Sequence, residues 1–315
     1  MNDSSHRLRL LRRMALLCVA LVLVITSLSA FLRLTQAGLG CADWPQCYGR
    51  ALAAQQHGAP PAADEARATA LARLAHRLVA SAALLLIVVM AMTCLATRPA
   101  WWRAGRLALA LLALALLLAL LGRFSSGARV PAVAIGNLLG GFLMLALAWL
   151  LVRDTAPQAA AAPPLRALAR LGIVLLLVQI ALGGLVSAGL AGRACPELLG
   201  CTTTGLPWQA LDPWREPLLD AARPGHVAGA LLQQVHRLGA VLVVGLLLPL
   251  GLVAWRRGPR RTGAVLLGLL ALQLALGAGL VVQDLPLALA LGHNLVAALL
   301  LATLFDLART PAALR

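Results

Sequence analysis

The sequence predicts an all-α, polytopic membrane protein in which eight transmembrane helices form two pseudo-symmetric four-helix bundles. The chain of 315 residues is 61% hydrophobic and only 12% charged, and its mean hydropathy is +0.87. Eight apolar runs are long enough to cross a bilayer, and a set of polar landmarks occurs twice in the same order. This composition excludes an ordinary soluble domain.

The eight apolar runs are expected to be helices rather than strands. A membrane span needs roughly 20 helical residues, and lipid offers no partner for free backbone N–H and C=O groups. Ala and Leu, which dominate the runs, also favour helix. The expected spans cover residues 14–32, 70–96, 104–122, 130–152, 168–190, 227–254, 262–282 and 286–307.

A cleaved signal peptide is the alternative interpretation of residues 1–30, which have a basic start and small residues near their end. The apolar stretch there has about 19 residues, whereas the apolar part of a signal peptide has roughly 7–15. We therefore expect the first helix to be retained.

The formal net charge of +16 indicates membrane topology rather than nucleic-acid binding. Every basic residue is Arg. With the N-terminus inside, sixteen of the 27 Arg but only three of the 11 acidic residues fall in cytoplasmic segments. This bias follows the positive-inside rule. We therefore expect a multi-pass protein of the inner (plasma) membrane, surrounded by lipid, with both termini cytoplasmic and no nucleic-acid partner.

A layout of cysteine pair, His-Arg pair and later polar residue occurs twice, which indicates a duplicated half. In each copy five residues separate the cysteines, and the His-Arg pair follows the first cysteine after 35 or 41 residues. We expect two four-helix halves, 1–152 and 168–315, joined by a cytoplasmic, Pro/Ala-rich linker at 153–167. The first copy comprises Cys41, Cys47, His76, Arg77 and Asn137, and the second comprises Cys195, Cys201, His236, Arg237 and His293.

The two cysteine pairs are expected to form short disulfides. Both pairs fall in long loops on the outer side, where the environment is oxidising. A zinc site is the alternative, but its four ligands would have to come from two separate loops. A short, exposed ring also leaves a redox role open. The other cysteines, Cys18 and Cys94, lie in apolar runs, where a free Cys behaves as a small hydrophobe.

Three histidines lie inside predicted helices, where ionisable groups are costly and commonly functional. His236 and His293 are at similar depths on the sixth and eighth helices, which run in the same direction. Two imidazoles that face each other across a bundle suit the axial positions of a haem. Hydrogen bonding between helices is the structural alternative. His76 and Asn137 hold the matching positions in the first half.

Arg77 and Arg237 directly follow histidines within apolar runs. A guanidinium in such a place needs an anion, and the propionates of a haem near the outer face would supply one. Snorkelling of the side chain to the membrane interface is the alternative.

Five segments carry a family resemblance: 38–47 (GLGCADWPQC), 75–77 (AHR), 179–187 (QIALGGLVS), 235–237 (VHR) and 292–294 (GHN). They resemble the haem A synthase family of cytochrome oxidase assembly, over essentially the whole chain. The resemblance implies a haem b cofactor in the C-terminal half, ligated by His236 and His293. It also implies that the N-terminal half, with His76 and position 137, binds haem O and oxidises its C8 methyl to a formyl group. Haem O synthase, oxidase-assembly proteins and a second copy of the chain are candidate partners.

Two positions of the N-terminal half depart from that family. The family has His where this chain has Asn137, and it typically has Glu at the position of Arg73. An amide is a poor iron ligand. Over the rest of the chain the resemblance holds, and it predicts a membrane haem A synthase-like oxidoreductase. One alternative is a paralogue that binds haem b and assists oxidase assembly without synthase activity. Another is a transporter, which the absence of a helix broken at mid-membrane disfavours.

Overall fold

The computed structural model of the chain describes residues 2–41, 43–49, 63–97, 101–124, 130–155, 162–201, 205–218 and 222–309. Within these ranges every regular element is helical, so the predicted fold class is confirmed. Eight of the described helices are long and apolar enough to cross a membrane. They are α1 Asn2–Gln36, α3 Ala63–Ala96, α4 Trp102–Phe124, α5 Pro131–Asp154, α6 Pro163–Ala188, α7 Val227–Arg257, α8 Arg260–Val282 and α9 Leu287–Ala308.

Several helices begin before the predicted apolar spans. α1 starts at Asn2 and α3 at Ala63, because a helix bonds its own backbone groups and can continue into the polar layer. α5 and α6 each begin with proline, which suits the first turn because the missing N–H would have no intrahelical partner there. Residues 156–161 of the predicted linker lie outside the described residues.

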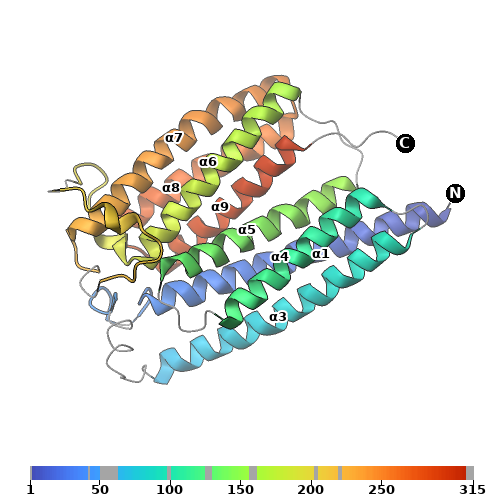
Figure 1. The fold of residues 1–315 in the computed structure, drawn as a ribbon. Helices are drawn as coiled ribbons and strands as arrows, with labels where there is room; N and C mark the ends of the chain where they lie inside the picture. The colour runs from blue at the N-terminus through green and yellow to red at the C-terminus, as the bar shows by residue number, and fades with distance from the viewer. Residues whose placement is uncertain are drawn as a thin grey trace.

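The spanning helices form two groups of four that lie side by side (Figure 1). In the first group α1 and α4 each contact α3 and α5, and in the second α7 and α9 each contact α6 and α8. In both groups, therefore, each helix contacts the helix before it and the helix after it in the sequence, and the last helix of the group also contacts the first. Across the boundary α5 packs against α6 and α9, and α1 packs against α9. A two-fold relation between the groups and the division at 153–167 stay predictions.

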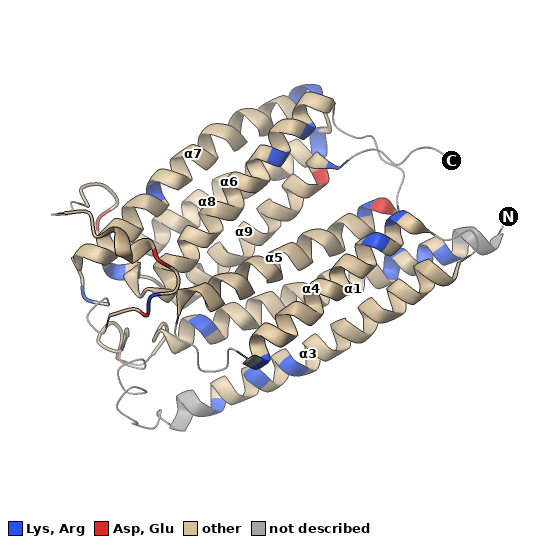
Figure 2. Cartoon of the chain, in the orientation of Figure 1, with Lys and Arg blue, Asp and Glu red and all other residues tan. Residues whose placement is uncertain are grey.

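The two chain ends lie at one end of the bundle, which we call the inner end (Figure 1). The loops that follow α1 and α6 lie at the opposite, outer end. Figure 2 shows Arg positions gathered at the inner ends of α1, α5, α6 and α7. This arrangement agrees with the charge bias of the sequence, and we expect the inner end to face the cytoplasm.

One apolar core extends through both groups. Ile87 and Phe142 from the first group and Leu247 and Leu301 from the second are each at most 1% exposed and belong to one cluster of buried side chains. Large apolar side chains also cover the outside, and Leu85 and Val241 are both 68% exposed. Such an exterior suits hydrocarbon rather than water.

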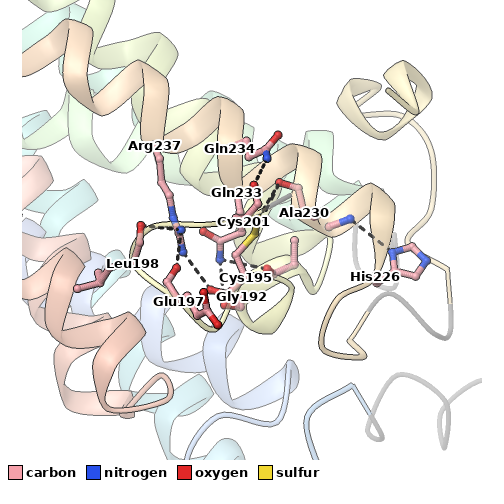
Figure 3. The surroundings of a disulfide bond; sticks show 12 residues. Gly192, Cys195, Glu197, Leu198, Cys201, His226, Ala230, Gln233, Gln234 and Arg237 are labelled. Atoms are coloured by element: carbon pink, nitrogen blue, oxygen red, sulfur yellow. Dashed lines mark hydrogen bonds between the residues drawn. A yellow bond between two sulfur atoms is a disulfide. The ribbon is translucent and has the colours of Figure 1, made fainter. Parts of the chain in front are cut away.

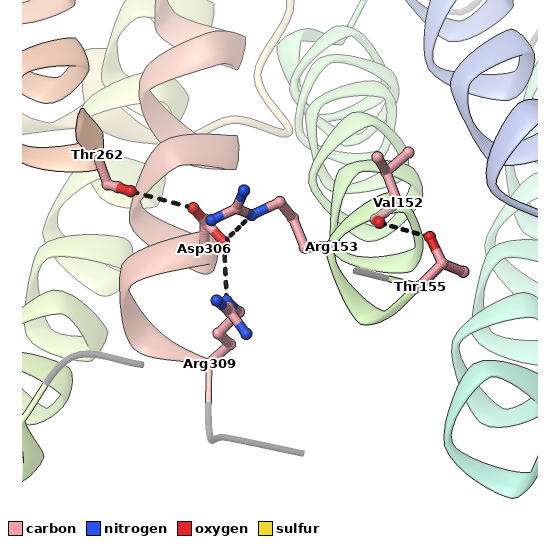
Figure 4. A network of polar contacts seen from close by, with 6 residues as sticks. All are labelled: Val152, Arg153, Thr155, Thr262, Asp306 and Arg309. Atoms are coloured by element: carbon pink, nitrogen blue, oxygen red, sulfur yellow. Dashed lines mark hydrogen bonds and ion pairs between the residues drawn. The ribbon is translucent and has the colours of Figure 1, made fainter. Parts of the chain in front are cut away.

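A polar network joins the two groups at the inner end (Figure 4). Asp306 on α9 is 8% exposed and accepts hydrogen bonds from Arg153 Nε on α5 at 2.7 Å and from Arg309 Nε at 3.0 Å. Its second carboxylate oxygen accepts from Thr262 Oγ1 on α8 at 3.4 Å. One carboxylate thus pairs with two guanidinium groups that come from different halves of the chain.

Candidate functional site

The second helix group brings the two predicted haem ligands together. His236 lies on α7 and His293 on α9, and these helices occupy opposite corners of the group because each packs against both α6 and α8. Both histidine side chains are partly buried within this group. Bis-imidazole ligation of a flat ring requires two such residues on opposite sides of it.

A glutamine from a neighbouring helix contacts each of these histidines. Gln179 Nε2 on α6 lies 3.0 Å from His236 Nδ1 and donates to the main-chain oxygen of His236 at 2.9 Å. Gln273 Nε2 on α8 lies 3.1 Å from His293 Nε2. Partners of this kind orient the ring of a ligating histidine and tune its basicity. The C-terminal half thus holds two imidazole–amide pairs rather than two isolated histidines.

Each glutamine is followed four residues later by a glycine that faces the same imidazole. A Cβ on Gly183 would lie 3.0 Å from His236 Cε1, and a Cβ on Gly277 would lie 3.2 Å from His293 Cε1. Any larger residue would therefore crowd the rings. The motif Gln-x-x-x-Gly occurs at 179–183 and 273–277, so one turn of helix supplies both the amide and the space beside it.

Several buried polar atoms around the imidazoles have no hydrogen-bond partner among the residues that the structure describes. They are His293 Nδ1, Gln179 Oε1 and Gln273 Oε1. An unpaired buried polar group costs about 1–3 kcal/mol, which is hard to sustain at three adjacent places without a ligand. Two imidazoles, each packed against a glycine, and the unpaired polar atoms beside them fit a haem held by His236 and His293.

Removing either amide should alter a haem bound there without abolishing binding. In Gln179→Leu or Gln273→Leu the imidazole loses its orienting partner, so we expect haem affinity to fall by about 10–100-fold and the midpoint potential to shift. A spectral redox titration of the purified variants measures the shift. Gln209→Leu, at an exposed position of the short helix Trp208–Leu211, is the control. Unchanged potentials in both interior variants would contradict the orienting role.

The predicted disulfides Cys41–Cys47 and Cys195–Cys201 are present. Figure 3 shows the second of them beside the first turns of α7, near Ala230. There Arg237 donates from Nη1 to the main-chain oxygens of Glu197 at 2.7 Å and Leu198 at 3.1 Å, and from Nη2 to that of Cys195 at 3.0 Å. The guanidinium that follows His236 therefore holds the disulfide loop over the site. Its direct contact with a haem stays a prediction.

The outer loops of the two halves are attached to each other. Tyr48 Oη, in the loop after α1, accepts a hydrogen bond from Gly192 N at 3.2 Å. The Trp44 and Tyr48 rings meet edge to face at 5.6 Å, Arg193 lies over Trp44, and Arg193 Nε pairs with Asp284 at 2.9 Å. Burial raises the pKa of Tyr48 to about 12, although the Gly192 bond and the Arg193 charge oppose it. The phenol therefore stays protonated, and the attachment is insensitive to physiological pH.

The first helix group presents a weaker site. His76 on α3 and Asn137 on α5 are both partly buried and lie on opposite corners of their group, as His236 and His293 do. Arg73 and Arg77 are exposed on the outside of α3. Neither α1 within 6–36 nor α4 within 102–123 carries an interior Gln, so the amide partners of the second group have no counterpart there. The asymmetry therefore goes beyond Asn137.

Three residues that contact the histidines or their neighbours were not predicted as site residues from the sequence. Gln179 was visible only as part of a family motif, and Gln273 and Arg33 gave no signal of their own. A search for a repeated Gln-x-x-x-Gly within apolar runs would have found both glutamines. Among the residues that the structure describes, no group of three or more His, Cys, Asp or Glu could hold a metal ion, which disfavours the zinc alternative. Cys18 and Cys94 are buried and unpaired, as predicted.

Comparison with known proteins shows the family to which the chain belongs. Residues 12–305 match the family model described as cytochrome oxidase assembly protein. The chain is 33% identical over 306 residues to a protein of Shewanella oneidensis named heme A synthase, which covers 90% of this chain and 91% of the relative. It is 36% identical over 227 residues to a heme A synthase of a Methylobacterium species, over 64% of this chain and 61% of that relative. The range matched by the family model includes His76, Asn137, His236 and His293. On this evidence the chain belongs to the cytochrome oxidase assembly protein family.

Proposed function

We propose that the protein is a haem A synthase-like membrane oxidoreductase, in which a haem b bound by His236 and His293 serves as cofactor. The observation that carries the proposal is the pair of interior imidazoles, each with its own glutamine and glycine. The names of the relatives support the same reaction class. A bis-imidazole haem, when bound, accepts and donates single electrons.

The proposed substrate is haem O, held in the first helix group by His76 and position 137. Conversion of the C8 methyl to a formyl group is a four-electron oxidation: with water as the formal oxygen source, it releases four protons and four electrons. The haem b would pass these electrons one at a time to an external electron acceptor, which takes up all four. In this proposal Asn137 leaves His76 as the one imidazole at the substrate iron.

A second candidate function is a family member that binds haem b and assists oxidase assembly without the synthase step. Asn137 and the exposed Arg73 favour it, because the first group lacks the imidazole and the carboxylate expected there. In either case we propose an inner-membrane location with cytoplasmic termini. Haem O synthase, oxidase-assembly proteins and a second copy of the chain are the proposed partners.

Pigment analysis distinguishes these two functions. Cells that co-express the protein with a haem O synthase, in a host without its own haem A synthase, are expected to accumulate haem A. Extraction and chromatographic separation of haems b, O and A measures this directly. His76→Ala is expected to leave haem O unconverted. If the wild-type protein yields only haem O, the synthase proposal fails and the assembly function takes its place.

A further inference from the structure

Arg33 is a cation of the first half that reaches into the second half. It lies near the outer end of α1, where its Nη1 donates to Ser187 Oγ on α6 and its Nη2 donates to Asn294 Oδ1 on α9 at 3.1 Å. The residues are 154 and 261 positions apart in the chain. The guanidinium is therefore fixed between three helices at the boundary of the two groups.

The partners of Arg33 lie beside the histidine pair. Ser187 follows Gly183, which faces the His236 ring, by one helical turn of about 5.4 Å. Because α6 runs toward the outer end, Ser187 lies on the outer side of that ring. Asn294 is the neighbour of His293 in the sequence. The guanidinium is thus bonded to one residue a turn outward of Gly183 and to one residue next to His293.

The charge of Arg33 is not matched by a protein carboxylate. Arg153 and Arg193 each pair with an aspartate, at 2.7 and 2.9 Å, whereas within the described part of the chain both contacts of Arg33 are to neutral groups. An arginine stays protonated and carries five N–H donors, of which these contacts use two. A partly buried cation inside a membrane span is costly unless an anion accompanies it. The remaining donors therefore point to an anionic ligand.

We propose that Arg33 binds a propionate carboxylate of a tetrapyrrole, with Ser187 and Asn294 holding the guanidinium in place. This inference rests on the proposed haem site. Guanidinium and carboxylate form paired, charge-assisted hydrogen bonds. The carboxylate belongs either to the haem between His236 and His293 or to the substrate haem of the first group, since Arg33 belongs to the first group and contacts the second. A residue of the first half thus completes a site of the second, or links the two sites.

The test compares full-length Arg33→Gln with Arg123→Gln, which removes the same charge from an exposed position at the end of α4. Spectral titration in detergent measures the affinity for haem b, for haem O and for the dimethyl ester of haem b, whose propionates carry no charge. For the affected haem we expect Arg33→Gln to bind at least about tenfold more weakly, since a hydrogen bond to a charged group contributes about 1.5–3 kcal/mol. Arg123→Gln should bind like the wild type. The dimethyl ester should bind equally to all three proteins.

The two haems identify the source of the carboxylate. Weaker binding of haem b assigns it to the cofactor, and weaker binding of haem O alone assigns it to the substrate. Arg33→Lys keeps the charge but loses the planar fork, so an intermediate affinity supports the inference. Equal affinities in Arg33→Gln and Arg123→Gln, or a loss that persists with the ester, would overturn it. The haem site itself is tested separately, because its failure would appear as haem binding that survives His236→Ala and His293→Ala.

Discussion

Purified protein carrying His236→Ala or His293→Ala is expected to lose the spectrum of a low-spin, six-coordinate haem. Each imidazole supplies one axial ligand, and alanine offers no atom that can replace it. His76→Ala should keep most of that spectrum, because His76 lies on α3 in the other helix group. Absorption spectra of the oxidised and reduced proteins measure the effect.

The His76→Ala variant is also the control for loss of haem through unfolding, because it removes a membrane-embedded imidazole of the same size. If the alanine variants at 236 and 293 unfold at the temperature of His76→Ala yet contain no haem, the loss reflects ligation. If instead His76→Ala removes the six-coordinate spectrum and the other two retain it, the assignment of cofactor and substrate to the two halves is wrong.

Asp306→Asn is expected to destabilise the fold by about 3–5 kcal/mol, as is usual when one partner of a buried ion pair is removed. The amide keeps the shape of the side chain but leaves the guanidinium groups of Arg153 and Arg309 without their shared carboxylate. Thermal unfolding in detergent, followed by circular dichroism, should show a clearly lowered transition.

Asp284→Asn is the matched control at the outer end. Its carboxylate also pairs with an arginine, Arg193, but the side chain is 48% exposed, and such pairs contribute only about 0–1 kcal/mol. The two substitutions change the same atoms in different surroundings. Equal transition temperatures for both variants would show that the Asp306 network does not hold the halves together.

Spanning helices and disulfides could be predicted from the sequence because each depends on a local property. A run of about 20 apolar residues has few alternatives to a spanning helix in a bilayer. Two cysteines six positions apart on the outer side are kept near each other by the short segment between them. The predicted starts of α1 and α3 were less accurate, because hydropathy no longer limits a helix where it leaves the hydrocarbon layer. His236 and His293 could be paired because depth follows from helix length.

The contacts of the site were harder to predict because they join distant residues on different helices. Gln273 looks like an isolated polar residue until α8 and α9 pack and place it 3.1 Å from His293. Arg33 likewise sits at the end of an apolar run, where snorkelling is the ordinary expectation. Only the packing of α1 against α9 places it near the second half. The neighbour order of the helices, and not any single helix, decides these roles.

The apolar core that runs through both helix groups has a consequence for how the chain comes apart. The two groups share part of their interior, since Phe142 and Leu247 belong to one cluster of buried side chains. We therefore expect the two groups to unfold together rather than as two independent domains. A substitution that destabilises the packing of the first group is therefore expected to lower the stability of the second group as well.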